Sequence, residues 1–324
     1  MNYELQKIKE NDVFTFEVYP TSEVISAGTI DADTGLAYAE DVPANDTAYF
    51  QIYVPEFINQ SKDIYIDWGD GIITRIDGSQ TGTIEFEHTY ASEFLDKKHI
   101  VTIFGSTYNR FRGYHNSKDD AEKNHLKSNI ISKIFSDGLL VPQCLINVSS
   151  CCRYNRRIQK IDMGWQYDIK NINTVTSAFS YCTNLIEVNV APTAKINYTH
   201  MYSLSHLFAY CTNLKISSLR MTPRAITSGG TYETYNSVYR DCVSLESDII
   251  SLIPVDGFIS KRANMSNTFE NCKKITCSNL GLLASFLWND TSRIFEGTRT
   301  TFNGSNILTQ YGNQIPTTWG GSKV

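Results

Sequence analysis

The clearest hydrophobic pattern is a short series of residues that recurs through the second half of the chain. It places an aromatic residue first, a cysteine three residues later, and Leu or Ile three residues after that. The full copies are Phe179/Cys182/Leu185, Phe208/Cys211/Leu214, Tyr239/Cys242/Leu245 and Phe269/Cys272/Ile275. This spacing brings the three side chains to one side of a helical or turn segment, where they can contact the neighbouring repeat.

Weaker copies extend the series at both ends. One lies at Val148/Cys151/Tyr154, and another has Phe295 in the aromatic position with Thr298 in place of the cysteine. The repeats then follow one another at intervals of about 30 residues, which is typical of a stacked repeat array with an atypical last copy. We therefore expect the aromatic residues, Phe295 included, to form one buried row, and the cysteines to form a second row beside it.

A brief alternation of apolar and polar residues follows each Leu or Ile. These runs lie at 186–190, 215–219, 248–253 and 275–280. Such alternation predicts a short strand with one buried face. Each repeat is thus predicted to be a short helix or turn, then a strand, then a polar loop, and only stacking can bury its apolar face.

The segments 175–182, 204–211 and 265–272 resemble the unit of BspA-type leucine-rich repeats. They read Val-Thr-Ser-Ala-Phe-Ser-Tyr-Cys, Leu-Ser-His-Leu-Phe-Ala-Tyr-Cys and Met-Ser-Asn-Thr-Phe-Glu-Asn-Cys. The resemblance covers roughly residues 148–305, although these repeats exceed the usual 20–29 residues. It implies an α/β solenoid over residues 148–324 that ends in a C-terminal cap.

Strand-like alternation of a different kind lies in the first half. Residues 48–54, 64–67 and 99–104 alternate apolar and polar positions, and Asp70-Gly71 supplies a tight turn. The string Asp-Trp-Gly-Asp-Gly at 67–71, with His88, Tyr90 and the following strand, resembles the PKD domain. This resemblance implies an immunoglobulin-like β-sandwich over residues 48–108, with Trp68 in its core and His88 in a structural place.

The remaining segments are less regular. Residues 1–47 are expected to form an N-terminal strand, at 13–19, and an arm that completes the sandwich or docks elsewhere. Residues 109–147 are expected to form a connector with one short helix at 119–127. The predicted fold class is therefore mixed: an N-terminal all-β immunoglobulin-like sandwich followed by a C-terminal leucine-rich-repeat-like α/β solenoid.

Charge and composition argue against several classes of partner. The net charge is −5 and no long basic run occurs, so nothing favours nucleic acid. The longest apolar stretch, Leu280–Trp288, is too short to cross a bilayer, so we expect no membrane insertion. The first residues are polar and of mixed charge, and we expect no secretory signal.

Cysteines and carboxylates raise the question of disulfides and metals. Of the eight cysteines, four occupy one place in successive repeats, where small buried side chains pack, so we expect them to be free thiols. Calcium could involve Asp67 with Asp70, or the acidic segment 31–35. The second fails the EF-hand pattern because Val42 stands where Glu is needed. We favour carboxylates that accept hydrogen bonds in turns, and we expect neither a metal nor a cofactor.

The functional hypothesis follows mainly from the two resemblances. No common catalytic motif is present, and both families imply modules for display and contact on cell-surface and virion proteins. Reduced cysteines without a secretory signal favour a non-enzymatic bacteriophage virion component, such as a capsid decoration, head fibre or tail-associated protein. It would assemble in the host cytoplasm, lie on the virion surface, and contact other virion proteins or host-surface glycans. The alternatives are an adhesin on the bacterial cell surface and a carbohydrate-binding accessory module.

Two loops between repeats are the candidate binding surface. Loops 191–203 and 222–237 are rich in Tyr, Thr, Ser and Asn, a mixture typical of antibody paratopes. The candidate binding residues are Tyr198, Tyr202, Arg224, Tyr232 and Tyr235. The alternative is that these rings pack onto neighbouring repeats.

Overall fold

The computed structural model describes most of the chain. The described residues are 13–56, 63–105, 108–113, 130–135, 139–141, 145–163, 172, 174–190, 203–219, 233–253, 262–288, 294–296 and 300–322. The helix expected at 119–127 lies outside them.

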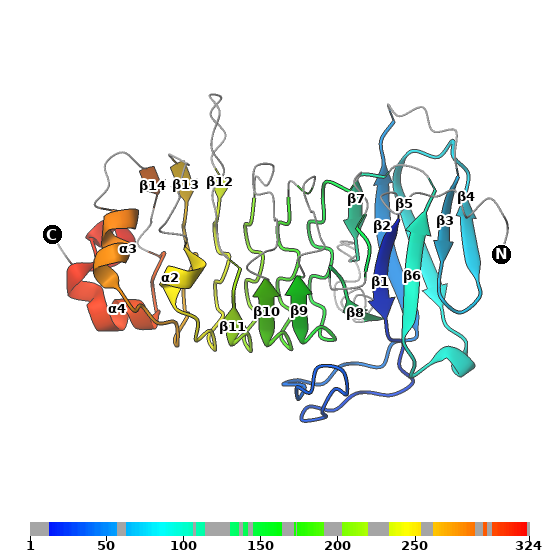
Figure 1. Ribbon diagram of the computed structural model, residues 1–324, viewed down its shortest axis with the longest axis horizontal. Helices are drawn as coiled ribbons and strands as arrows, with labels where there is room; N and C mark the ends of the chain where they lie inside the picture. Colours follow the sequence, from blue (N-terminus) through cyan, green and yellow to red (C-terminus); the bar gives the residue numbers. More distant parts are fainter. Residues whose placement is uncertain are drawn as a thin grey trace, which may run out of the picture.

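The N-terminal part is a sandwich of two antiparallel sheets (Figure 1). One sheet has the order β4-β3-β6-β1-β8, with strands Ile73–Ile76, Ile64–Asp67, His99–Phe104, Phe14–Val18 and Ile131–Lys133. The other has the order β5-β2-β7, with strands Gly82–Thr89, Thr47–Val54 and Arg110–Arg112. The sandwich thus extends past the expected 48–108, since β1 comes from the first segment and β7 and β8 come from the connector.

Trp68 anchors the core between these sheets, as predicted. It is buried, packs 5.3 Å from Phe50, and donates its indole N–H to Thr74 Oγ1 at 2.8 Å. The turn after it is held by carboxylates, because Asp67 Oδ1 accepts from the Gly69 N–H and Asp70 Oδ1 accepts from the Ile72 N–H.

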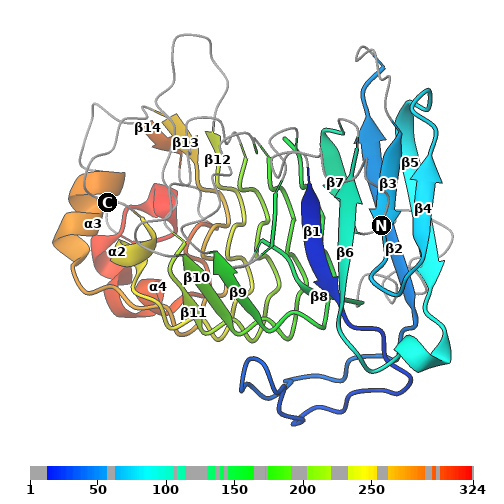
Figure 2. The ribbon, with the colours of Figure 1, turned by 45° about the vertical axis from the view of Figure 1, so that its right-hand side comes forward.

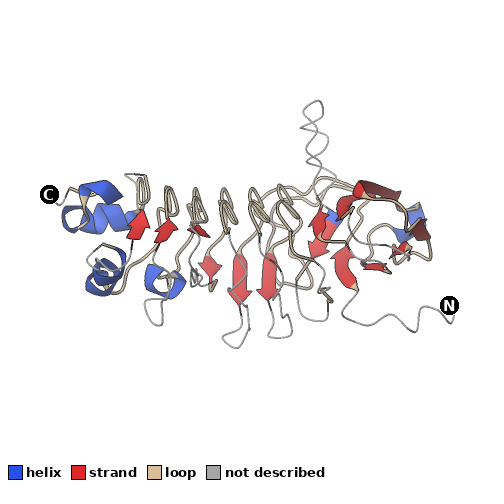
Figure 3. Ribbon diagram, turned by 90° about the horizontal axis from the view of Figure 1, so that it is seen from above, coloured by secondary structure: helices blue, strands red, loops and turns tan. Residues whose placement is uncertain are grey.

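The C-terminal part is a row of coils that stack side by side along the long axis (Figure 1, Figure 3). Three short parallel strands, β9 (Lys160–Met163), β10 (Glu187–Val190) and β11 (Ile216–Ser217), pair along one side. Another parallel set consists of β12 (Glu233–Thr234), β13 (Arg262–Asn264) and β14 (Ile294–Glu296). We call this part the coil stack.

The predicted α/β solenoid is wrong. Helices in the described residues of the coil stack are confined to its C-terminal half: α2 (Ile249–Leu252), α3 (Leu280–Leu287), α4 (Asn306–Tyr311) and the short 3₁₀ segments Gly312–Gln314 and Thr317–Trp319. The only other described helix is the 3₁₀ segment Ser92–Phe94 in the sandwich. The repeated aromatic-cysteine-leucine series forms tight turns instead of helices.

Backbone conformation explains why turns form. Two residues four positions apart have positive φ in each of these coils, for example Ser177 at 55° with Tyr181 at 62°, and His206 at 57° with Tyr210 at 65°. A left-handed residue interrupts a right-handed helix and reverses the chain locally. The predicted spacing of three residues between the aromatic, cysteine and Leu or Ile positions is therefore correct. It arises from successive tight turns and not from a helix.

The aromatic row runs through the centre of the coil stack. Neighbouring rings lie 5.7–6.0 Å apart and nearly parallel, in the order Phe179, Phe208, Tyr239, Phe269 and Phe302. The first four members are as predicted. The fifth is not Phe295, which lies in strand β14. Phe295 pairs with Ala263, which precedes the aromatic residue Phe269 of its own coil, and Phe302 stacks on Phe269 instead.

The cysteine row lies beside the aromatic row. The thiols of Cys182, Cys211, Cys242 and Cys272 each donate to a backbone carbonyl one coil earlier, at 3.0–3.1 Å. All seven described cysteines are buried and free, and burial raises the pKa of Cys211 to about 12. These thiols fill the core, as predicted, and are poor nucleophiles because the thiolate is disfavoured.

The first coil is shifted by four residues from the predicted alignment, which placed Val148 in the aromatic position and Cys151 in the cysteine position. The Cys182 thiol donates to Cys152 O, and the Cys152 N–H donates to Ala178 O just as the Phe179 N–H donates to Leu207 O. Cys152 therefore holds the aromatic position and Asn155 the cysteine position. The buried Cys151 suggested the wrong alignment, because an asparagine holds the cysteine position of this coil.

Both ends of the coil stack are covered. Helices α3 and α4 close the C-terminal end, where Trp319 stacks 6.0 Å from Phe302 (Figure 2). The sandwich closes the other end, since the Gly113 N–H donates to Cys151 O and Asn155 Nδ2 donates to Ile131 O, each at 2.9 Å. One apolar cluster extends from Phe14 to Trp319. The sandwich and the coil stack therefore share a core.

Candidate functional site: an arm that joins the sandwich to the coil stack

Residues 19–46 form an extended arm between strands β1 and β2. Its two sides pair at single bridges, Thr21 with Asn45, Ile25 with Val42, and Ile30 with Ala37. The arm leaves the end of the sandwich and lies beneath the first coils (Figure 1, Figure 2). Of the two roles expected for the arm, completing the sandwich or docking elsewhere, it takes the second, and it docks on the coil stack of the same chain.

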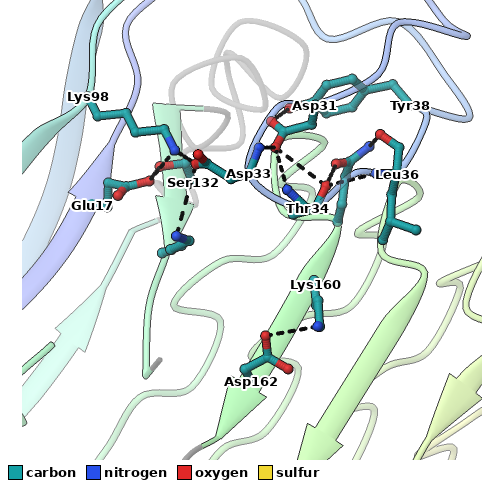
Figure 4. Close-up of polar contacts among 12 residues, drawn as sticks. Glu17, Asp31, Asp33, Thr34, Leu36, Tyr38, Lys98, Ser132, Lys160 and Asp162 are labelled. Carbon is teal, nitrogen blue, oxygen red and sulfur yellow. Dashed lines mark hydrogen bonds and ion pairs between the residues drawn. The ribbon is translucent and has the colours of Figure 1, made fainter. Parts of the chain in front are cut away.

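The tip of the arm is organised by one carboxylate. Asp31 Oδ1 accepts from the N–H groups of Asp33 and Thr34 at 3.0 and 3.1 Å, and its Oδ2 accepts from the Tyr38 hydroxyl at 2.9 Å (Figure 4). Both carboxylate oxygens are thus used as turn acceptors, as expected for a hydrogen-bonded acidic turn.

Two contacts fix the arm to the first and second coils. At the first coil, Thr34 Oγ1 donates to Gln159 Oε1 at 2.6 Å, and Gln159 Nε2 donates to Leu36 O at 3.1 Å. At the second coil, the Glu40 N–H donates to Asn184 Oδ1 at 2.7 Å, and Asn184 Nδ2 donates to Glu40 O at 2.9 Å. The Glu40 carboxylate also accepts from Thr183 Oγ1 at 2.7 Å and lies 3.9 Å from Arg156 Nε.

A group of charges fixes the arm to the sandwich. Asp33 forms ion pairs with Lys98, directly before β6, and, at 4.0 Å, with Lys133 on β8 (Figure 4). Lys98 also lies 3.8 Å from Glu17 on β1, which accepts from Ser132 Oγ at 2.7 Å. The arm thereby connects the sandwich, at the start of β6 and on β8, to two coils.

A cation–aromatic contact lies beneath the arm. The buried Arg157 guanidinium of the first coil packs 4.0 Å from the Tyr19 ring and 6.0 Å from the Tyr38 ring. Burial lowers the pKa of Arg157 and raises the pKa of Tyr38. Such a contact stabilises a buried cation by the negative face of each ring.

Three partly exposed tyrosines stack on the turns of the coil stack. Tyr154 and Tyr210 flank Tyr181 at 4.5 and 4.3 Å. The Arg153 guanidinium packs on the rings of Tyr154 and Tyr181. Each of the three has a positive φ. Because their faces contact one another, these rings offer mainly their edges and hydroxyls to solvent.

The residues proposed from the sequence are only partly described. Tyr235 is 5% exposed, so it does not present a ring for binding; its N–H donates to Asn264 O in the next coil. Tyr198, Tyr202, Arg224 and Tyr232 lie outside the described residues.

The remaining sequence candidates lie in the sandwich. His88 Nε2 is 2.7 Å from Asp70 Oδ2, and the imidazole stacks 4.6 Å from Trp68. Both side chains of the pair are largely buried, so this contact fixes the turn in place. In the described part of the chain, no three His, Cys, Asp or Glu side chains form a group suited to a metal ion.

Sequence reasoning missed the targets of the arm. Thr-Asn recurs at 183–184 and 212–213 within the repeats, and that recurrence was the available signal. It could not indicate that Glu40, far away in the sequence, would dock there.

No helix among the described residues is long and apolar enough to span a bilayer. Comparison with protein-family models, curated proteins and solved structures gave no match.

Proposed function

We propose that this chain is a non-catalytic structural protein of a bacteriophage particle, in which the coil stack is a rigid element that displays a contact surface. The observation that carries the proposal is the single apolar core from Phe14 to Trp319, reinforced by the arm. Interfaces between domains that move are usually small and polar. A continuous core and a bridging arm favour a stiff rod.

The state of the cysteines supports assembly in a reducing compartment. The seven described cysteines are free and buried, and burial raises the pKa of Cys211 to about 12. Disulfides are rare in the cytosol and common in secreted proteins. This pattern fits a protein that folds in the host cytoplasm and becomes exposed on a virion surface afterwards.

In this proposal, the sandwich docks on the particle and the coil stack points toward other virion proteins or host-surface glycans. Docking of this kind needs an extended complementary surface and no reactive group. The partly exposed turns, with the Tyr154–Tyr181–Tyr210 stack, supply such a surface.

Mass spectrometry of density-purified particles from the source genome tests the proposal. We expect the chain at a constant ratio to the major capsid protein across gradient fractions. A mock gradient from uninfected host cells is the control. Absence of the chain from the particles, or its recovery from washed bacterial envelopes, would overturn the proposal and favour an adhesin.

A further inference from the structure

Two successive coils carry the same four residues, Cys-Thr-Asn-Leu, at 182–185 and 211–214. The two asparagines are structurally equivalent, because Asn184 Nδ2 donates to Arg156 O and Asn213 Nδ2 donates to Thr183 O, each at 2.8 Å. Each amide thus donates one N–H to a backbone carbonyl of the preceding coil. An Asn amide retains a second N–H and its carbonyl oxygen for a further partner.

The second coil shows what such an amide binds. Asn184 accepts from the backbone N–H of Glu40 and donates to the backbone C=O of the same residue, at 2.7 and 2.9 Å. The neighbouring Thr183 hydroxyl donates to the Glu40 carboxylate at 2.7 Å. The Thr-Asn pair therefore recognises one acidic residue of an extended segment, through its backbone and its side chain together.

The third coil presents the same pair without an occupant among the described residues. Thr212 and Asn213 are both partly exposed. Within that part of the chain, the Asn213 carbonyl oxygen and the Thr212 hydroxyl accept or donate no hydrogen bond. Lys215, two residues further on, is exposed and forms no ion pair there. It offers a cation for an acidic ligand, as Arg156 does beside Glu40.

We propose that Thr212 and Asn213 form a second docking pair, which binds an extended acidic segment of a partner protein in the way that Thr183 and Asn184 bind Glu40. The site is confined to the third coil. The fourth coil has Val243 and Ser244 at the equivalent positions, with Glu246 nearby, so it lacks the amide and repels an acidic ligand. This inference stands independently of the proposed function.

Fluorescence anisotropy with the full chain and a labelled peptide of residues 37–43 tests the proposal. This peptide contains Glu40 and its neighbours, so it reproduces the segment that the second coil already holds. We expect saturable one-to-one binding. Asn213→Ala should weaken it about tenfold, because two backbone hydrogen bonds are lost, and a peptide with Gln in place of Glu40 should also bind more weakly.

Two further variants make the result specific. Thr212→Val keeps the side-chain shape, removes only the hydroxyl and should weaken binding severalfold. Ser244→Ala alters the equivalent position of the fourth coil and should leave binding unchanged. Absence of saturable binding, or equal affinity for the wild type and for a folded Asn213→Ala variant, would overturn the proposal. The latter result would mean that the peptide displaces the arm at Asn184 or binds elsewhere.

Discussion

Replacing Asn184 by Ala measures how strongly the arm is held on the coil stack. The Asn184 side chain is 0% exposed and makes three hydrogen bonds, one to Arg156 O and two to the backbone of Glu40. Asn213 is the matched control, since it makes only the equivalent bond to the preceding coil. The difference between the two variants therefore isolates the contacts with the arm.

The magnitude follows from those two extra bonds. A typical intramolecular hydrogen bond contributes about 0.5–1.5 kcal/mol to stability, and a buried group left without its partner costs more. We therefore expect Asn184→Ala to lower the free energy of unfolding by about 1–3 kcal/mol more than Asn213→Ala does. Urea denaturation followed by circular dichroism gives both values.

Proteolysis provides a second measurement on the same variants. A protease specific for glutamate can cut the arm after Glu40 only when the arm leaves Asn184, because bound backbone is protected. Cleavage should be faster in Asn184→Ala than in the wild type or in Asn213→Ala. Equal destabilisation by the two substitutions, together with unchanged cleavage, would refute the docking of the arm.

Further substitutions test the core and its titrating groups. Phe208→Ala should destabilise the protein by about 3–5 kcal/mol in urea denaturation, because it leaves a cavity between two stacked rings. Burial, followed by the charges of Arg240 and Arg153, lowers the pKa of His206 below its usual 6.5. The unfolded chain then binds more protons than the folded one, so stability should fall as pH drops through about 6.5. Thermal melts of His206→Asn at several pH values should show a weaker dependence. Asn is chosen because it tolerates the positive φ of this position. Cys211 should resist a thiol reagent in the folded protein and react fully in urea, where burial no longer raises its pKa. Calcium should leave the melting temperature unchanged, since the Asp31 oxygens already accept hydrogen bonds; a rise of several degrees would contradict this.

The repeat pattern predicted the rows of the coil stack well, but it did not predict their local conformation. The rows depend on which side chains are apolar and on how far apart they recur, and both are visible in the sequence. The choice of turns over helices depends on backbone φ at positions such as Tyr181 and Tyr210. Tyrosine is not a residue that normally signals positive φ, so a helical interpretation was available and wrong.

Alignment at the ends of the array also required the structure. The last aromatic position is held by Phe302, and the first by Cys152. These shifts are four residues at the first coil and seven at the last. They change little in a local pattern of apolar residues, yet the hydrogen bonds between coils are compatible with only one alignment.

By itself, the sequence determined that two different parts follow one another, that the second is a stacked array with rows of aromatics and free cysteines, and that Trp68 anchors the first. Those features arise from local periodicity and from short-range turn chemistry. Only the tertiary structure decided that the first strand lies inside the sandwich and that the arm binds Gln159 and Asn184. Contacts of this kind join residues more than a hundred positions apart, and they depend on where the folded backbone places a single amide, which no local pattern encodes.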